Sequence, residues 1–323
     1  MKKKVLLTEA IRPIGIELLK NAADVEFHIA EDRSERYIQT IIPDYDAVIT
    51  RTTVIGKEII DAGSKLQAIG RHGAGLDLID LEAAGKRGIS VLYTPAANAR
   101  SVAEFVVAMM LALSRRLIPG DQAQRIEGNF SMRNSLMGND VENKVLGIVG
   151  LGRIGRYIAK MAGQGLDMKV YAFDPYVPAE SMKEVGAVKV EEITDILKVA
   201  DFLSFNCALT DDVRGLMNLE RLKMMKPTAY IINCARGPII VEEDLAQALR
   251  EGIIAGAALD VYHQEPPSKD NPLFKAPNLI ATPHLATMSE ESMDRMSETL
   301  VVDVLHVLAG EKPNFLAPGT GRV

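Results

Sequence analysis

The segment VLGIVGLGRIGRYIAKMAG, residues 145–163, constrains the fold of this chain more than any other stretch. Its glycines at 150, 152 and 155 form a G-x-G-x-x-G motif between an apolar run and an amphipathic helical pattern. The next apolar run ends at Asp174, and 174 − 155 = 19 residues is close to the spacing of about 20 in dinucleotide-binding folds. Strand, glycine turn, helix and a second strand ending in an acid together predict a parallel α/β sheet.

The same motif predicts a ligand. Glycines allow a tight turn and let backbone N–H groups approach a pyrophosphate, which the positive end of the following helix attracts. Arg153 and Ile154 lie within the same motif. An acid in the place of Asp174 accepts hydrogen bonds from ribose hydroxyls and repels a 2′-phosphate, so the expected cofactor is NAD rather than NADP. The alternative is a glycine turn with a purely structural role.

Short apolar runs alternate with amphipathic segments along the whole chain, and 323 residues suit two domains better than one. Such alternation predicts parallel sheets with helices on both faces. Expected strands in the first part are Val5–Leu7, Val25–Ile29, Ala47–Thr50, Leu66–Ile69 and Ile89–Tyr93. Those in the second part are Val145–Val149, Val170–Phe173, Phe202–Phe205, Ala229–Ile232, Ala257–Leu259 and Leu279–Ala281.

The stretch SVAEFVVAMMLALSRR, residues 101–116, predicts an unusual helix. Ser101 and Glu104 fit an S-x-x-E capping box that would fix its start. From Phe105 to Leu113 the pattern is apolar on every side, so we expect burial all round, inside one domain, between two domains or between two subunits. A last helix is expected from about 289 to 309, and the segments 128–144 and beyond 310 look loose.

Composition and charge exclude several classes of protein. With 37 Lys and Arg against 43 Asp and Glu, the net charge of −6 offers no basic field for nucleic acid. No run approaches the roughly 20 apolar residues of a membrane span, and the N-terminal run stops at Thr8, too early for a secretory signal. Only Cys207 and Cys234 are present, which fits a reducing compartment. We therefore expect a cytoplasmic protein with no nucleic-acid, membrane or metal partner.

Three polar residues follow successive expected strands, at the sheet edge where open α/β folds bind ligands. Arg236 comes after the run AYIIN, Glu265 after AALD, and His284 after LIAT, 284 − 265 = 19 residues later. An arginine can bind a carboxylate with two hydrogen bonds, and a carboxylate beside a histidine orients the ring and raises its pKa. Taken singly, each residue has an ordinary structural explanation: a surface arginine, a solvated loop acid and a histidine held by local hydrogen bonds. Together, beside a dinucleotide loop, they predict hydride transfer with His284 as the proton donor.

Four motifs, GIVGLGRIGR, INCARG, ALDVYHQEPP and ATPHLA, resemble in order and separation those of the D-isomer-specific 2-hydroxyacid dehydrogenases. The stretch RHGAGLDLIDLEAAGKRGISVLYTPAANARSVAEF resembles the phosphoglycerate dehydrogenases in particular. The resemblance covers essentially the whole chain and implies Arg236, Glu265 and His284 as a catalytic set. It further implies an NAD site built from Gly150, Gly152, Arg153, Ile154, Gly155, Asp174, Cys207, Cys234, Asp260 and Ala286.

The resemblance also implies an architecture. We expect a Rossmann NAD-binding domain over residues 99–288 and a smaller, discontinuous, flavodoxin-like substrate domain over 1–98 and 289–323. A homodimer clasped through the cofactor domain is the family habit and would suit the apolar helix. The chain resembles a short form without the regulatory domain that longer members append, so serine feedback through such a domain is not expected.

For the substrate, the resemblance implies that backbone N–H groups of Gly73, Ala74 and Gly75 hold a carboxylate. Arg51 and Arg71, with Arg133 reaching across a dimer, would add cations for a dianionic tail. The alternative is that Arg51 and Arg71 only hold their domain together. We expect 3-phosphoglycerate as the substrate, with hydroxypyruvate or glyoxylate reduction, or oxidation of a related anion such as sulfolactate, as the runner-up.

The chain departs from the family pattern at several positions. Leu78 stands where Asn is frequent, NCA at 206–208 replaces a usual His-x-Pro, and Ala286 replaces a frequent glycine. No departure removes a catalytic group, but each leaves the subgroup open. A hypothesis from another class is an NAD-responsive corepressor that binds partner peptides; retention of all three catalytic residue types argues against it.

Overall fold

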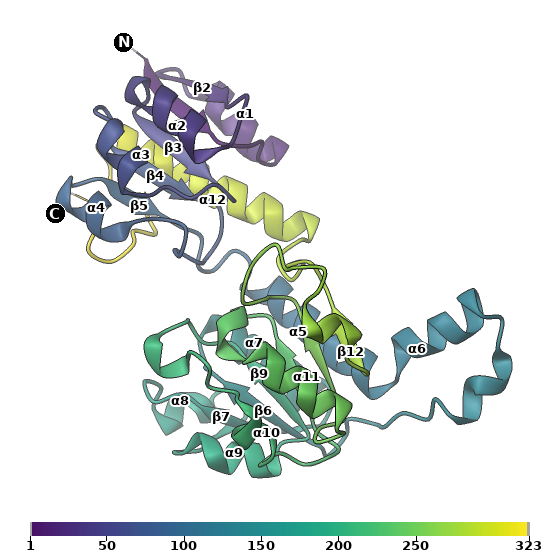
Figure 1. Ribbon diagram of the computed structural model, residues 1–323. Helices are drawn as coiled ribbons and strands as arrows, with labels where there is room; N and C mark the ends of the chain where they lie inside the picture. The colour runs from purple at the N-terminus through teal and green to yellow at the C-terminus, as the bar shows by residue number, and fades with distance from the viewer. Residues whose placement is uncertain (1, 322–323) are drawn as a thin grey trace. The chain divides into compact units, whose positions relative to one another are not determined.

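The computed structural model describes residues 2–321, and its contacts divide the chain into two compact units (Figure 1). The first unit joins Met1–Asn98 to Thr287–Val323, and the second is Ala99–Ala286. Each unit is built around one parallel β-sheet.

The first unit has a 5-stranded sheet in the order β2-β1-β3-β4-β5, the doubly wound order of flavodoxin-like folds. Its strands are β1 (Lys3–Leu7), β2 (Val25–Ile29), β3 (Ala47–Thr50), β4 (Ala68–Arg71) and β5 (Ser90–Leu92). Its helices are α1 (Pro13–Asn21), α2 (Glu35–Ile41), α3 (Lys57–Ala62), α4 (Leu81–Lys86) and α12 (Glu290–Leu308), with the 3₁₀ turn η1 (Ile42–Asp44).

Helix α12 belongs to the core of this unit although it lies at the other end of the sequence. Its Leu300, Val301 and Val304 are buried with Val5 and Leu7 of β1. Ser289 caps the helix by accepting a hydrogen bond from the Ser292 N–H, which confirms the start expected from the sequence. The discontinuous chain thus closes a single apolar core.

The second unit has a 7-stranded parallel sheet in the order β12-β11-β10-β9-β6-β7-β8. Its strands are β6 (Val145–Val149), β7 (Lys169–Phe173), β8 (Ala187–Lys189), β9 (Phe202–Phe205), β10 (Tyr230–Asn233), β11 (Gly256–Leu259) and β12 (Leu279–Ala281). Strand order reverses between β6 and β9, which is the switch point of a Rossmann fold where dinucleotides bind. Both sheets confirm the expected α/β fold class.

Helices cover both faces of this sheet, with one buried cluster on each side. They are α5 (Ala99–Ser114), α6 (Leu117–Asp121), α7 (Arg153–Gly165), α8 (Ala179–Lys183), α9 (Ile193–Val199), α10 (Leu219–Leu222) and α11 (Glu242–Arg250). Short turns are η2 (Gln122–Ile126), η3 (Phe130–Asn134), η4 (Asp211–Val213), η5 (Gly237–Ile239) and η6 (Pro272–Lys275). Within the described residues, every helix is too short or too polar to cross a lipid bilayer.

Two expectations from the sequence are wrong in detail. Helix α5 begins at Ala99, so Ser101 lies inside the helix and is not its N-cap, and Glu104 instead pairs with Arg100 at 2.8 Å. In the single chain Ala108 of α5 is exposed and Phe105 is partly exposed, so the burial of this helix on all sides stays a prediction. The short edge strand β8 has no counterpart among the expected strands, because three residues carry no clear periodicity.

Of the two segments that look loose in the sequence, only the C-terminal tail differs from expectation. The tail is attached to its own unit: Ala317 N–H donates to Val91 at 2.8 Å, and the buried Asp303 carboxylate accepts the Asn314 and Phe315 N–H groups. The segment 128–144 contains η3. Together with α6 and η2 it forms an arm, residues 117–144, which extends away from the 7-stranded sheet (Figure 1). Its apolar side chains are largely exposed.

Candidate active site

The loops that follow β10, β11 and β12 carry the three residues singled out by the sequence. These strands are adjacent and parallel, so their carboxyl ends meet at one edge of the sheet. Arg236 comes three residues after β10, Glu265 six after β11 and His284 three after β12. Topology therefore brings residues 48 positions apart in sequence, 284 − 236, to one edge.

Glu265 and His284 contact each other directly. The Glu265 Oε2 lies 2.7 Å from His284 Nδ1, and Glu265 Oε1 accepts the Tyr262 N–H at 3.1 Å. Half of the His284 side chain is exposed. The carboxylate therefore fixes one ring nitrogen and leaves the other to exchange a proton.

Electrostatics reinforce this pair. The hydrogen bond to Glu265 raises the pKa of His284 above 6.5; the charges of Glu265 and Asp260 add to it, while burial and Arg236 oppose it. Burial raises the pKa of Glu265, but the His284 hydrogen bond and charge, the Tyr262 N–H and Arg236 outweigh burial and bring that pKa below 4.5. Arg236 thus influences both members of the pair, as expected of a nearby cation.

A buried carboxylate shapes the loop that carries His284. Asp260 is fully buried, and its oxygens accept the Thr282 hydroxyl at 2.6 Å and the Leu285 and Ala286 N–H groups at 2.7 and 2.8 Å. His284 itself has φ +56°, a conformation that costs a non-glycine residue energy and persists only where its surroundings enforce it. Asp260 supplies that enforcement.

Asn233, the last residue of β10, performs a similar task for Arg236. Its side-chain amide donates to the Arg236 carbonyl at 2.9 Å, and its Oδ1 accepts the Ala235 N–H at 3.0 Å. Gly237 follows in close contact with the backbone of Tyr262, where a Cβ atom would lie 1.9 Å from the carbonyl carbon. The Arg236 turn and the Glu265 loop are therefore packed backbone to backbone.

The glycine loop between β6 and α7 fits a dinucleotide. Gly150 has φ +90° and lies against the backbone of Cys207, while a Cβ on Gly155 would lie 2.4 Å from the Gly150 carbonyl oxygen. A Cβ on Gly152 would meet only open space, so the backbone there can approach a ligand. Arg153 and Ile154 open α7 at this point. These are the three distinct tasks that dinucleotide-binding glycines perform.

Asp174 lies at the end of β7 and holds the loop. Its Oδ2 accepts the Leu151 N–H at 2.8 Å and its Oδ1 accepts the Tyr176 N–H at 2.9 Å. Carboxylate oxygens each offer two lone pairs, so the group retains capacity to accept ribose hydroxyls. The residues present therefore fit NAD.

Two cysteines and Ala286 complete the predicted cofactor set. Burial raises the pKa of the Cys207 thiol to about 11 and raises the pKa of the Cys234 thiol as well, so both are neutral near pH 7. Both are free thiols. Ala286 is buried and donates its N–H to Asp260, whereas Cys207 lies directly against Gly150.

The residues predicted to bind the substrate tail lie in the first unit, at the ends of β3 and β4. Thr50 pairs with Arg71 in parallel register, so Arg51 and Arg71 are neighbours. Burial lowers the pKa of His72 to about 4, and the charges of Arg51 and Arg71 contribute to this shift. Arg71 folds back onto the His72 carbonyl oxygen at 2.5 Å over Gly73, which has φ +149°. Arg51 lies 3.1 Å from the Met288 sulfur.

The loop of Gly73, Ala74 and Gly75 follows β4 directly. The structure thus brings both arginines and this loop together. Arg133 lies elsewhere, exposed on η3 of the arm of the second unit. Among the residues described, no group of three or more His, Cys, Asp or Glu side chains is arranged to hold a metal ion.

Comparison with known proteins agrees with this geometry. Two doubly wound sheets, a glycine loop with its acid and an Arg–Glu–His cluster define a protein of the NAD-binding dehydrogenase class. Residues 107–286 match the model of the D-isomer specific 2-hydroxyacid dehydrogenase, NAD binding domain. The chain belongs to the D-isomer specific 2-hydroxyacid dehydrogenase family.

Individual relatives are similar over nearly the whole chain. A Staphylococcus aureus protein with the general name of a 2-hydroxyacid dehydrogenase is 37% identical, covering 97% of this chain and 99% of the relative. A D-3-phosphoglycerate dehydrogenase of Methanocaldococcus jannaschii is also 37% identical, over 95% of this chain but 58% of its own. The chain spans little more than half the length of such relatives. A Thermus thermophilus protein of solved structure is 31% identical, with a TM-score of 0.88 over 97% and 99% of the two chains.

Proposed function

We propose that this chain is an NAD-dependent dehydrogenase that interconverts a D-2-hydroxy acid and its 2-oxo acid, and that the substrate is 3-phosphoglycerate. The observation that carries the proposal is the Glu265–His284 hydrogen bond of 2.7 Å, with Arg236 close enough to influence the pKa of both residues. A carboxylate-held imidazole beside a guanidinium can both bind an oxo acid and exchange a proton with it.

Each residue has one task in this proposal. Arg236 binds the substrate carboxylate and polarises the neighbouring oxygen. His284 exchanges a proton with that oxygen through Nε2, while Glu265 holds the ring through Nδ1. When bound, NAD supplies the chemistry of hydride transfer at the substrate carbon. We assign cofactor binding to residues 99–288 and substrate binding to 1–98 with 289–323.

The choice of 3-phosphoglycerate follows from charge. Arg51 and Arg71 stand side by side next to the Gly73–Gly75 loop, and two guanidinium groups suit a phosphate tail better than a neutral one. Several relatives 36–39% identical carry the name D-3-phosphoglycerate dehydrogenase, which supports the same choice.

Steady-state kinetics test the substrate. We expect NADH formation with 3-phosphoglycerate, at a lower KM than with unphosphorylated glycerate. Arg51→Ala should raise the KM for 3-phosphoglycerate roughly 10- to 100-fold, since hydrogen bonds to charged groups contribute about 1.5–3 kcal/mol. The KM for glycerate should hardly change. An unchanged KM for 3-phosphoglycerate would contradict the tail assignment, and hydroxypyruvate, glyoxylate and sulfolactate would then be compared.

We further infer a homodimer. The arm exposes six large apolar side chains: Leu117, Ile118, Ile126, Phe130, Met132 and Met137. So many exposed large apolar side chains between positions 117 and 137 are unusual for a soluble monomer, and the incompletely covered helix α5 directly precedes the arm in the chain. A second copy of this chain is the occupant we propose. It would also carry Arg133 toward a neighbouring active site.

A further inference from the structure

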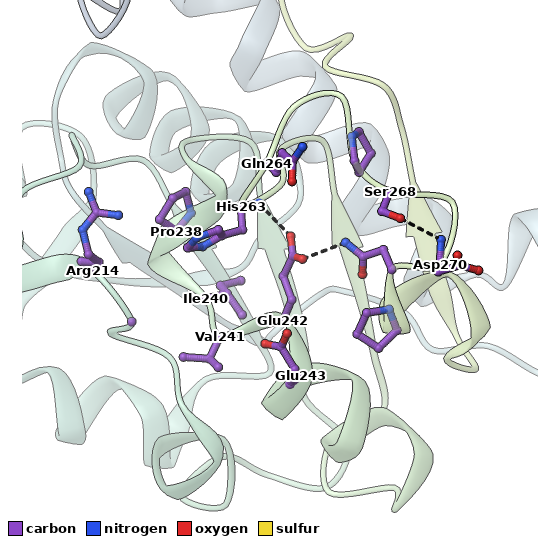
Figure 2. Close-up of a pocket in the computed structure, with 14 residues that line it drawn as sticks. Arg214, Pro238, Ile240, Val241, Glu242, Glu243, His263, Gln264, Ser268 and Asp270 are labelled. Atoms are coloured by element: carbon purple, nitrogen blue, oxygen red, sulfur yellow. Dashed lines mark hydrogen bonds between the residues drawn. The ribbon is translucent and has the colours of Figure 1, made fainter.

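Glu242 joins the two loops of the candidate active site. It is the first residue of α11, directly beyond the turn that carries Arg236. Its Oε1 accepts the His263 N–H at 2.7 Å, and its Oε2 accepts the side-chain amide of Asn271 at 2.7 Å (Figure 2). His263 and Asn271 stand on either side of Glu265, so one carboxylate holds both ends of the Glu265 loop.

The remaining contacts make this connection stiff. Asn271 is buried, and its Oδ1 accepts the Leu273 N–H at 3.0 Å, which fixes the direction of its amide. Gly237 lies against the Tyr262 backbone, and the Tyr262 N–H in turn donates to Glu265 Oε1 at 3.1 Å. A displacement of the loop at His263 therefore reaches Glu265 across one intervening residue, Gln264.

The chemistry of the clamp requires a carboxylate. Its two partners are both donors, a peptide N–H and an amide N–H, and only an ionised carboxylate offers two acceptor oxygens. The position at the start of a helix also favours negative charge. Glu243, the next residue, is exposed and takes part in neither hydrogen bond.

We propose that Glu242 is a positioning residue, whose carboxylate clamps the Glu265 loop against the Arg236 turn and keeps Glu265 within hydrogen-bonding distance of His284. The consequence for turnover rests on the proposed function, whereas the clamp itself can be tested without any substrate.

The first test measures the pKa of His284 by NMR titration of its ring resonance in the protein without cofactor. The five histidines are distinguished by the resonance lost in His284→Gln. In Glu242→Ala we expect the pKa of His284 to fall toward its ordinary value of 6.5, because the hydrogen bond to Glu265 that raises it is loosened. Its other charged neighbours, Asp260 and Arg236, are retained.

The matched control is Glu243→Ala, which should leave the His284 pKa as in the unaltered protein. An unchanged His284 pKa in Glu242→Ala overturns the proposal. If Glu242→Ala does not fold, Glu242→Gln serves instead, since its amide keeps one acceptor oxygen. A smaller fall in the His284 pKa is expected there, and no fall overturns the clamp.

The second test uses activity. Glu242→Ala should lower kcat by roughly 10- to 100-fold with little change in the KM for NAD, because misplacement of catalytic groups by about 1 Å costs on the order of 10²-fold. A cavity of about 440 Å³ borders Glu242 and His263, so acetate can enter the space left by the side chain. Added acetate should restore part of kcat in Glu242→Ala alone.

The two tests separate the clamp from the proposed function. If the unaltered protein is inactive on every hydroxy acid but Glu242→Ala still lowers the His284 pKa, the clamp is supported and the proposed function is contradicted. If the unaltered protein is active and Glu242→Ala keeps the normal kcat, only the clamp is contradicted. A low kcat that acetate does not restore also contradicts the clamp.

Discussion

His284 Nδ1 lies 2.7 Å from Glu265 Oε2, although the two residues are 19 positions apart in the sequence. An ionised carboxylate can only accept a hydrogen bond, so the ring proton of this contact resides on Nδ1. The Nε2 atom is then the one that can gain or lose a proton near neutral pH. Glu265 therefore holds the ring through Nδ1, and Nε2 is the nitrogen that can exchange a proton with a substrate.

Removing the ring tests its role in turnover. In His284→Ala we expect kcat to fall by roughly 10²–10⁴-fold, the usual contribution of positioned acid–base catalysis. The glycine loop and Asp174 do not contact His284 in any described hydrogen bond, so NADH should bind as before in a fluorescence titration. A parallel loss of NADH affinity would instead assign the ring a structural role.

Asp174 should set the preference between NAD and NADP. Asp174→Ala removes the charge that repels a 2′-phosphate, so kcat/KM with NADP should rise relative to NAD. The substitution also removes the acceptor of the Leu151 N–H, which loosens the glycine loop. Asp174→Asn is the control, because its amide oxygen can still accept that N–H. If neither variant changes the ratio of the two kcat/KM values, Asp174 does not contact the ribose.

The apolar arm should be required for association. Phe130 and Met137 are 70% and 82% exposed, so an aspartate at either position costs nothing in the single chain but opposes burial against a second copy. We expect Phe130→Asp to halve the mass measured by light scattering. Val199→Asp, an exposed apolar position outside the arm, should leave the mass unchanged. A Phe130→Asp protein with the same mass as the unaltered protein would contradict the proposed interface.

The features that sequence alone predicts best are those whose requirement is local. Gly150 needs a positive φ, and Gly155 needs a close approach to the Gly150 carbonyl. Both requirements favour glycine, so they can be recognised in the sequence. Residues after successive parallel strands meet at one edge by topology. For that reason the order of strands and loops along the chain is enough to predict Arg236, Glu265 and His284 as neighbours.

Other features depend on tertiary contacts that leave no local pattern. Glu242 resembles an ordinary first-turn acid of a helix, and its task depends on donors 21 and 29 residues away. Asp260 is expected at the cofactor by resemblance to the family, and no local pattern indicates that both its oxygens also accept hydrogen bonds from the His284 loop. Ser101 has the spacing of a capping box, yet Glu104 pairs with Arg100 and the helix starts earlier.

The dependence of kcat/KM on pH tests whether His284 exchanges the proton, because it reports the protonation state of His284 in the free enzyme. Oxidation of a hydroxy acid needs the neutral ring as proton acceptor, and reduction of an oxo acid needs the protonated ring. Oxidation should therefore rise, and reduction fall, as pH increases through the His284 pKa, which Glu265 holds above 6.5.

The same two profiles measured on Glu265→Gln complete the experiment. Without the carboxylate, the pKa of His284 loses its main upward influence, so both transitions should move to lower pH together. Opposite slopes in the two directions, shifted together by Glu265→Gln, are the predicted result. Profiles with the same slope in both directions, or transitions that stay in place in Glu265→Gln, would rule out His284 held by Glu265 as the group that exchanges the proton.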